Sequence, residues 1–327
     1  MDPAGRPVLV TGAAGFLGAN LVRALLGAGA RVDAVVRPGG SHWRLAGLAH
    51  EPGLRLHEAD VRDGAGVAGV VGAARPEAIF HLAASGGHAR TAEQREEALA
   101  TSVLGTHHVL QAAARRGVAR VVHAGSHLEC EPRDGRLDEG APLGPVTFRG
   151  MAKAAAFLVC REAARAGLPV VILRPFHVYG PWEGNGRLVP AAILAALRGE
   201  ELPLTAPGLR RDPVFVADVV AAFLLALRPE LPPGEVLHIG SGQAWANEEI
   251  VAVAAECAGR PVPTVLDGYP SSATDPGAPI ADPSRAARVL GWRPGHSLRE
   301  GMARTVEWFR DHMDLYGRSL PATARSR

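Results

Sequence analysis

Short apolar runs alternate with longer stretches of helical periodicity along the first half of the chain. The apolar runs predict six strands, at residues 7–11, 31–36, 54–59, 78–84, 118–124 and 169–173. The periodic stretches predict helices at residues 19–27, 64–74, 92–116 and 150–166. Strands and helices that alternate at this spacing form a parallel sheet covered by helices on both faces. The pattern therefore predicts an α/β fold with a doubly wound parallel sheet.

A glycine-rich turn joins the first predicted strand to the first predicted helix. Gly12, Gly15 and Gly18 stand at the spacing of a Rossmann-type dinucleotide turn. Gly12 permits the tight turn, Gly15 lets a pyrophosphate approach backbone N–H groups at a helix N-terminus, and Gly18 lets the helix pack on the sheet. Residues 1–175 are therefore predicted to form a dinucleotide-binding domain.

The end of the second predicted strand bears on the choice of cofactor. Enzymes that prefer NAD usually carry an acidic residue here, which holds the ribose 2′-hydroxyl. This chain has none, and Arg37 with Ser41 would suit a 2′-phosphate. We therefore expect NADP(H) as the preferred cofactor, with NAD(H) as the alternative.

The second half of the chain has connections rich in proline and glycine. It is predicted to form a smaller substrate-binding lobe over residues 176–317, with later strands near 214–240 that return to the main sheet. One helix is predicted at 188–197, and another begins near Asn247, a suitable N-cap residue. Residues 318–327 lack an apolar pattern and are predicted to form a disordered tail.

Composition argues against several functional classes. The 327 residues carry a net charge of +2 without a basic block, so we expect no nucleic-acid or anionic membrane partner. No apolar run reaches the length of a membrane-spanning helix, and the 13 histidines show no metal-ligand spacing, so we expect no metal site. Three widely spaced cysteines fit reduced thiols in a cytoplasmic protein.

Lys153 is the only lysine, because the remaining 34 of the 35 Lys and Arg residues are arginine. Its neighbourhood, R-G-M-A-K-A-A, resembles the Y-G-x-x-K-A-A segment of the short-chain dehydrogenase/reductases. Further motifs in family order are the T-G-A-A-G-F-L-G turn, H-L-A-A at 81–84, G-S-H-L-E at 125–129 and R-P-F-H-V-Y-G-P at 174–181. Over residues 7–310 the chain resembles the extended branch of that family, the nucleotide-sugar epimerases and dehydratases.

The resemblance implies a set of catalytic residues. In the family a Ser or Thr orients the substrate, a tyrosinate is the acid/base, and a Lys lowers the pKa of that tyrosine and holds the nicotinamide ribose. Ser126 and Lys153 match two of these positions, while Arg149 replaces the tyrosine. The asparagine that serves the family's proton relay is also replaced, by Ser102. The predicted site therefore keeps the family's geometry without its acid.

Arg149 changes the chemistry that such a site can perform. A guanidinium cannot shuttle a proton near neutral pH, because its pKa lies above about 12. Arg149 can instead stabilise a developing alkoxide, or bind a carboxylate or phosphate of the substrate. It stands one helical turn from Lys153, and two such cations repel each other, which hints at an anion beside them. The alternative is that Arg149 points outward into solvent.

Another group must then carry the proton. His127 and His177 are the favoured pair, because the unperturbed pKa of histidine suits proton transfer near neutrality. A hydroxyl of the substrate is an alternative. The other candidate residues are Glu129, Cys130, His88 and Tyr179.

The resemblance also assigns binding residues. Beyond the glycine turn, Arg37 and Ser41, the expected cofactor contacts are Phe16, Leu17, Asp60, Val61, Leu82, Ala83, Ala84, Lys153, Pro175 and His177. The expected substrate contacts are His88, Glu129, Arg149, Leu188, Val189 and Arg211. Arginines such as Arg187 and Arg211 would hold a diphosphate. Helices near 92–116 and 150–166 form a homodimer interface in many family members, so we expect a homodimer.

Together these features predict an NADP(H)-dependent enzyme that reduces a carbonyl of a nucleotide-activated keto-sugar or related keto intermediate, without the usual tyrosine. The context that the resemblance implies is specialised metabolism, such as antibiotic biosynthesis. Two alternatives stay open. One is an epimerase, dehydratase or cyclase that recycles a tightly bound NAD(P), and the other is a non-catalytic protein that kept the fold and the cofactor.

Overall fold

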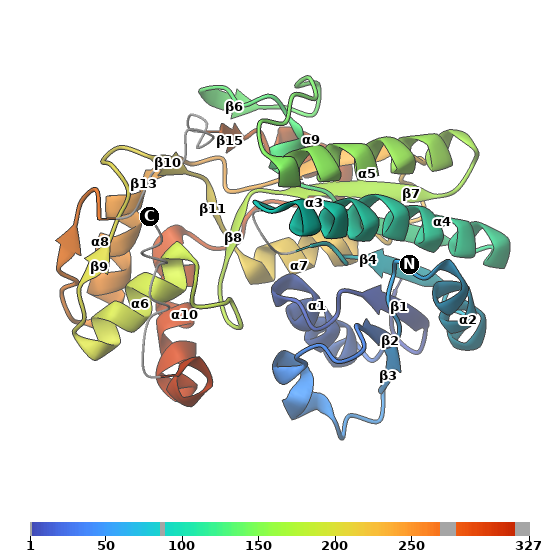
Figure 1. Ribbon diagram of the computed structural model, residues 1–327, viewed down its shortest axis with the longest axis horizontal. Helices are drawn as coiled ribbons and strands as arrows, with labels where there is room; N and C mark the ends of the chain where they lie inside the picture. Colours follow the sequence, from blue (N-terminus) through green and yellow to red (C-terminus); the bar gives the residue numbers. More distant parts are fainter. Residues whose placement is uncertain (1, 86–88, 269–278, 318–327) are drawn as a thin grey trace.

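The computed structural model describes residues 2–85, 89–268 and 279–317 (Figure 1). Parallel strands form the main sheet in the order β12-β7-β5-β4-β1-β2-β3. Their bounds are β1 Pro7–Thr11, β2 Arg31–Val36, β3 Leu54–Glu58, β4 Ala78–His81, β5 Arg120–Ala124, β7 Val170–Pro175 and β12 Glu235–Ile239. The strand order reverses between β1 and β4, and ligands of such sheets bind at the C-terminal strand ends near this point. The predicted α/β fold is confirmed.

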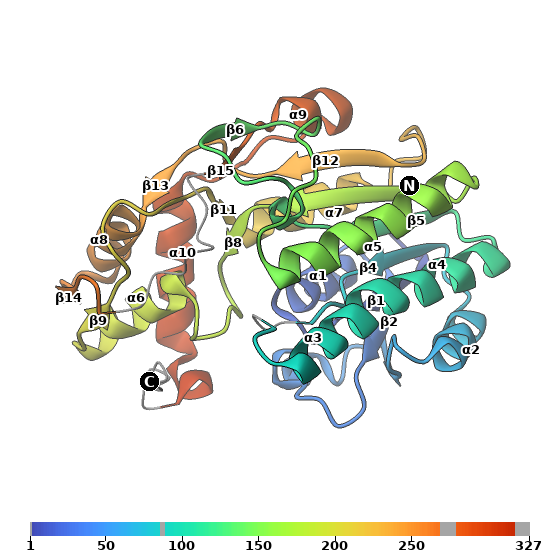
Figure 2. The same cartoon turned by 45° about the horizontal axis from the view of Figure 1, so that its top comes forward.

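Apolar cores lie on both faces of this sheet. Successive residues of a strand point to opposite faces, so Val8 and Val10 join one core and Leu9 joins the other. The first core is closed by α1 Phe16–Gly27 and α7 Val216–Leu225, and the second by α2 Gly64–Ala74, α4 Gly105–Arg116 and α5 Phe148–Arg165. Figure 2 shows α4 and α5 lying side by side over the second face.

The remaining elements form a smaller lobe, on the left of Figure 1, and its connections to the sheet. The helices are α6 Leu188–Arg198, α8 Asn247–Ala258, α10 Leu298–Asp311 and, beside β12, α9 Ser284–Leu290. Short strands pair as β8 His177–Tyr179 with β11 Pro213–Phe215, β10 Arg210–Arg211 with β13 Trp245–Ala246, β9 Leu202–Pro203 with β14 Thr264–Val265, and β6 Gly135–Leu137 with β15 Pro279–Ala281. Among the described residues, no helix has the length and apolar character that crossing a bilayer requires.

The chain passes between the two lobes more than once. β11 pairs with β8 outside the main sheet, whereas β12 joins the main sheet beside β7. The division of the chain near residue 175 stays a prediction. The predicted disordered tail, 318–327, lies outside the described residues.

The helix predicted over residues 92–116 is interrupted. One π-helical turn, Ala100–Leu104, joins α3 (Ala92–Leu99) to α4. The next residue, Gly105, packs tightly against the loop after β3, since a Cβ there would lie 2.7 Å from Val61 Cγ2. Single π turns inside helices occur frequently at functional sites. The apolar periodicity did not predict this turn, because a π turn adds one residue to a turn of the helix without changing which residues are apolar and which are polar.

Several element ends also differ from the prediction by a few residues, among them the end of the fourth strand and the start of α8. The fourth strand ends at His81, because the glycine turn packs against the backbone of Leu82 and Ala83. Asn247 is the first residue of α8 and not its N-cap, a position that Ala246 occupies. The Asn247 amide instead donates to Thr205 Oγ1 at 3.1 Å, which ties α8 to the neighbouring loop.

Candidate active site

The glycine turn closes tightly around the C-terminal ends of β1 and β4. Gly12 has a φ of +68°, and a Cβ there would lie 2.7 Å from the backbone N of Ala83. A Cβ at Gly18 would lie 2.1 Å from the carbonyl O of Gly12, so both positions require glycine. Gly15 is the N-cap of α1, and no side chain caps this helix end. The backbone N–H groups of the first turn therefore form a cradle that fits the pyrophosphate of a dinucleotide.

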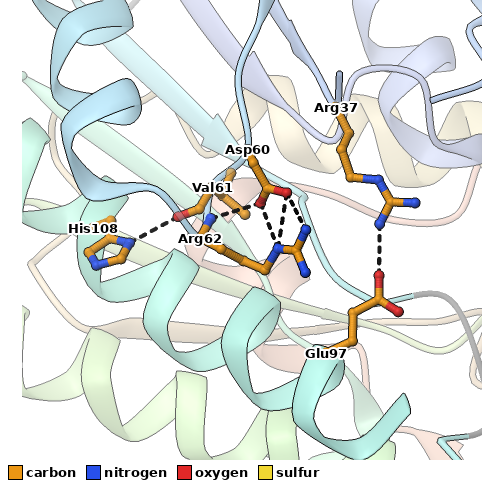
Figure 3. Close-up of polar contacts among 6 residues, drawn as sticks. All are labelled: Arg37, Asp60, Val61, Arg62, Glu97 and His108. Atoms are coloured by element: carbon orange, nitrogen blue, oxygen red, sulfur yellow. Dashed lines mark hydrogen bonds and ion pairs between the residues drawn. The ribbon is translucent and has the colours of Figure 1, made fainter. Parts of the chain in front are cut away.

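Figure 3 shows polar contacts at the neighbouring strand ends. Arg37, after β2, donates to Glu97 Oε1 of α3 at 2.7 Å. These side chains are 60% and 40% exposed, so the pair stabilises the fold by no more than about 1 kcal/mol. Asp60, after β3, accepts hydrogen bonds from the guanidinium and from the backbone N of Arg62, and these lower the pKa of Asp60. Ser41 lies exposed on the loop that follows β2.

The other predicted cofactor residues lie at the same edge of the sheet. Phe16 and Leu17 begin α1, Pro175 is the last residue of β7, and the others follow the C-terminal ends of β3 and β4: Val61, Leu82, Ala83 and Ala84. The carbonyl O of Val61 lies 3.0 Å from His108 Nδ1 of α4 (Figure 3), which fixes that loop. The structure thus brings these residues to one edge of the sheet.

A buried carboxylate fixes Ser126 just after β5. Glu129 accepts a hydrogen bond from the backbone N of Ser126 and another from Arg174 Nε of β7, both at 2.7 Å. The side chains of Glu129 and Arg174 are 0% and 2% exposed. Burial raises the pKa of Glu129, and the positive charge of Arg174 opposes that rise. Glu129 therefore holds the loop in place, with its carboxylate occupied by protein donors.

Lys153 lies buried beside this loop. Its Nζ donates to the carbonyl O of Ala124 at 2.6 Å. Burial lowers the pKa of Lys153 to about 8, the charge of Glu129 opposes the decrease, and the charge of Arg149 adds to it. Gly150 permits the close approach of α5 to the loop, because a Cβ there would lie 2.4 Å from the carbonyl O of Leu128.

Arg149 occupies the first turn of α5. Its Nε is shielded from solvent and has no hydrogen-bond partner among the described residues. Burial lowers the pKa of Arg149, and the charge of Arg187 lowers it further. Arg149 in turn contributes to lowering the pKa of His127. The guanidinium therefore lies near the predicted catalytic loop in a region of positive potential.

The two imidazoles expected to carry protons lie together. The rings of His127 and His177 are 4.7 Å apart, and His127 stacks on Phe176 at 4.9 Å. His127 Nδ1 lies 3.4 Å from the carbonyl O of Pro175, so Nδ1 carries the proton and Nε2 the lone pair. Burial lowers the pKa of His127 to about 4 and the pKa of His177 well below its ordinary value. Both rings are therefore neutral at pH 7.

Arg211 determines the tautomer of His177. The pairing of β8 with β11 brings the two residues together, and Arg211 Nη1 lies 3.1 Å from His177 Nε2. A guanidinium has donors only, so Nε2 accepts and the proton of the neutral ring is on Nδ1. His177 Nδ1 is shielded from solvent and has no hydrogen-bond partner in the described part of the chain.

The sequence analysis missed a buried polar chain between the glycine turn and the π turn. Thr11 Oγ1 accepts the N–H of Ala83 at 3.3 Å and lies 2.7 Å from His81 Nδ1. His81 Nε2 lies 2.9 Å from Thr106 Oγ1, which donates to the carbonyl O of Ser102 at 2.5 Å. Burial lowers the pKa of His81 to about 3, so the ring is neutral. The one sequence signal for this polar chain was His81, a histidine in an otherwise apolar strand.

The remaining candidates are dispersed. Leu188 and Val189 begin α6 in the smaller lobe. Cys130 and Tyr179 are buried, and burial raises the pKa of both, so neither is ionised at neutral pH. His88 lies outside the described residues.

Known proteins of the same fold carry the same elements. A sequence model of the NAD-dependent epimerase/dehydratase family matches residues 8–240. The chain belongs to this family. It is 31% identical to a dTDP-glucose 4,6-dehydratase of Streptomyces griseus, over 96% of this chain and 97% of that protein. A UDP-glucose 4-epimerase structure from Thermotoga maritima, with UDP-glucose, superposes with a TM-score of 0.86 at 29% identity, covering 94% of this chain and 99% of that one.

A dTDP-glucose 4,6-dehydratase structure from Streptomyces venezuelae, with NAD bound, superposes with a TM-score of 0.83 at 31% identity, covering 94% and 98% of the two chains. The predicted membership of the extended short-chain dehydrogenase/reductases is confirmed, and the protein is an enzyme of the NAD(P)-dependent epimerase/dehydratase type. These relatives support the epimerase or dehydratase alternative and do not specifically support a carbonyl reductase.

Glu129→Gln tests the role of the buried carboxylate. The substitution leaves the Arg174 charge buried without its counter-ion, so the free energy of unfolding should fall by about 3 kcal/mol. The matched control is Glu256→Gln, which breaks the exposed pair with Arg299 and should cost less than about 1 kcal/mol. Urea denaturation at pH 7 measures both. Equal effects of the two substitutions would contradict the structural role of Glu129.

Proposed function

We propose that this enzyme modifies the sugar ring of a nucleotide-activated sugar, as an epimerase or dehydratase that regenerates its nicotinamide cofactor in each turnover. The observation that carries the proposal is the grouping of Ser126 and Lys153 with the neutral pair His127 and His177 at the ends of β5 and β7. Relatives that align over nearly the whole chain support the same reaction class.

The crevice residues would hold the cofactor. The cradle at Gly12, Gly15 and Gly18 fits the pyrophosphate, and the ammonium of Lys153 would hold the nicotinamide ribose. A cofactor held there would supply reversible hydride transfer to and from a sugar carbon.

His127 would accept the proton that the absent tyrosine cannot. Its Nε2 carries the lone pair, and the ring is neutral at pH 7. Ser126 would orient the sugar hydroxyl that loses the proton. Arg149 would stabilise the negative charge that develops on the sugar oxygen, as a donor in an oxyanion hole does.

The smaller lobe would hold the nucleotide portion of the substrate. Arg187 is the N-cap of α6 and its charge acts on Arg149, while Arg211 lies just before β11 and contacts His177 of β8. Guanidinium groups bind diphosphate oxygens through paired hydrogen bonds. Leu188 and Val189, in the first turn of α6, would border the same pocket.

Carbonyl reduction is the second candidate reaction. Arg149 is a cation beside Lys153, and it would stabilise the alkoxide left by hydride addition to a keto-sugar, which a proton from water would convert to the alcohol. The two reactions differ in whether the cofactor is consumed. A reductase consumes one NADPH for each product molecule, whereas an epimerase or dehydratase shows turnover without net loss of cofactor absorbance at 340 nm.

His127→Phe keeps the stacking on Phe176 and removes the proton acceptor. We expect kcat to fall by about 10²–10⁴-fold, with nucleotide-sugar affinity preserved. Because neutral His127 is the active form and its pKa is about 4, wild-type activity should be lost as pH falls through about 4, not near 6.5. Activity measured across pH 3.5–8 checks this, with the exposed His50→Phe as the control. Full activity of His127→Phe would remove His127 from the mechanism.

We propose that NADP(H) is preferred and that Arg37 binds its 2′-phosphate. No acidic side chain follows β2, and the pair with Glu97 is an exposed one that a phosphate can replace. Arg37→Gln should weaken NADPH binding about tenfold, or about 1.4 kcal/mol, and leave NADH binding unchanged. The control is Arg31→Gln, at the opposite end of β2. Fluorescence titration measures the affinity of each protein for NADPH and for NADH. Tighter binding of NADH than of NADPH by the wild type would overturn this assignment.

We also propose a homodimer formed through the outer face of α3, α4 and α5. Leu99, Leu104, Met151 and Leu158 are 44%, 54%, 46% and 56% exposed on these adjoining helices. Large apolar side chains grouped on one face favour a protein interface. Leu104→Glu combined with Leu158→Glu should give a monomer in sedimentation velocity, whereas Leu315→Glu, on the other lobe, should leave the dimer intact. A monomeric wild type would end this proposal.

A further inference from the structure

The connection between β8 and α6 fastens the smaller lobe to the lobe of the main sheet. It runs between α1 and α10 (Figure 1). The carbonyl O of Pro181 accepts a hydrogen bond from Asn20 Nδ2 of α1 at 3.0 Å. The next carbonyl O, that of Trp182, accepts one from Arg44 Nε at 2.7 Å. Arg44 belongs to the 3₁₀ helix η1 Trp43–Leu48, which follows the loop after β2. Two successive residues of the connection are therefore held by the main-sheet lobe.

The indole of Trp182 lies between the same two lobes. The Arg23 guanidinium of α1 lies over this ring, 3.9 Å from its centroid. The ring of Trp308, in α10, is 4.8 Å from Trp182 on the side of the smaller lobe, and the ring of Trp43 is 5.7 Å away in η1. Cation–π contacts and tilted aromatic pairs of this kind are attractive. They add to the hydrogen bonds that join the lobes here.

The backbone at Trp182 has a conformation that a bulky residue rarely adopts. Its φ is +72°, in the left-handed region. The next residue, Glu183, is held from the smaller lobe, because its carbonyl O accepts from Tyr316 Oη at 2.8 Å. A strained residue persists only where several contacts fix it, and such residues gather at ligand clamps and switch regions. The contacts around Trp182 therefore oppose a backbone strain that opening would relieve.

The same contacts reach the cofactor cradle. Arg44 Nη1 donates to the carbonyl O of Ala14 at 3.4 Å, in the glycine turn directly before Gly15. Arg23 Nη2 donates to the carbonyl O of Arg44 at 2.6 Å, which fixes η1 on α1. The loop of residues 37–42, where the adenosine ribose is proposed to bind, leads directly into η1. This loop is therefore anchored at its far end by the contact between the lobes.

We propose that Arg44 and Trp182 form a latch that gates exchange of the nicotinamide cofactor. While the latch is closed, the loop 37–42 and the glycine turn stay in place around the cofactor, and entry and exit both require the latch to open. Arg44 and Trp182 act through the backbone that they hold, so they are positioning residues. The inference rests on the proposed function in that the cradle holds a dinucleotide. Slow exchange would keep the cofactor in place between the two hydride transfers of one turnover.

The test measures the exchange rates of whichever of NADPH and NADH the wild type binds more tightly. Stopped-flow fluorescence gives the association rate constant, and displacement by an excess of the oxidised form gives the dissociation rate constant. Arg44→Ala removes a hydrogen bond to each lobe and should raise both rate constants about tenfold. Kd should stay within about threefold of wild type, because opening a gate lowers the barrier in both directions.

Two variants at position 182 separate the ring from the backbone. Trp182→Gly accepts the same positive φ but removes the indole, so both rate constants should again rise about tenfold. Trp182→Phe keeps an aromatic ring beside Arg23 and should stay within about threefold of wild type. A cooperative urea transition shows that each variant is folded.

The matched control is Arg310→Ala. Arg310 Nη2 donates to the carbonyl O of Ala258 at 2.8 Å and so joins α10 to α8 within the smaller lobe. The substitution removes the same kind of contact away from the glycine turn, and both rate constants should stay within about twofold of wild type. Equal acceleration in Arg310→Ala would overturn the inference, because general loosening of the smaller lobe would then explain the effect.

The other results separate the inference from the proposed function. Unchanged rate constants in both Arg44→Ala and Trp182→Gly would overturn the latch and leave the proposed function intact. A weaker Kd with an unchanged association rate constant in Arg44→Ala would also overturn the latch, since Arg44 would then bind the cofactor itself. Failure of the wild type to bind any form of NAD(H) or NADP(H) would overturn the proposed function together with the inference.

Discussion

The arrangement of the site depends on the buried ion pair between Glu129 and Arg174. The pair joins the loop after β5 to β7, and the Arg174 guanidinium also lies over the ring of Phe157 in α5, 4.3 Å from its centroid. Glu129 holds the backbone of Ser126 with its second oxygen, and the absence of a side chain at Gly125 makes room for that oxygen. Three elements distant in sequence thus meet at one carboxylate. Separating them would leave a charge buried without a partner, which keeps the loop and α5 in one relative position.

Positive charge gathers around the first turn of α5 and the neutral ring of His127. Arg149 and Lys153 lie near the N-terminus of α5, an end that carries a partial positive charge of its own. Burial lowers the pKa of His127 to about 4, and the charges of Arg211 and Arg149 add to the decrease, so its lone pair is available at neutral pH. The same positive potential favours any negative charge on a substrate oxygen. In the proposed mechanism this potential would favour the developing anion, while His127 would serve as a separate base.

The sequence predicted those elements whose structure depends on residues close together in the chain. Apolar runs located the strands of the main sheet, and the spacing of Gly12, Gly15 and Gly18 located the cradle at the start of α1. The polar chain through His81 was not predictable, because its partners Thr11 and Thr106 lie 70 and 25 residues away in the sequence. The π turn before α4 was missed because it alters hydrogen bonding and not polarity. Likewise, His127 and His177 could be named as a pair from their types, but their tautomers follow only from contacts with Pro175 and Arg211.

The retention of a single lysine also follows from geometry. Lys153 is 6% exposed, and within the described part of the chain its Nζ has one acceptor, the carbonyl O of Ala124. An arginine there would bring five N–H donors in a rigid fork to a buried site with one carbonyl to receive them. The unsatisfied donors would each cost free energy, and the charge would persist at every accessible pH. An ammonium with a pKa near 8 can instead rotate its donors toward the ribose and respond to the field of Arg149.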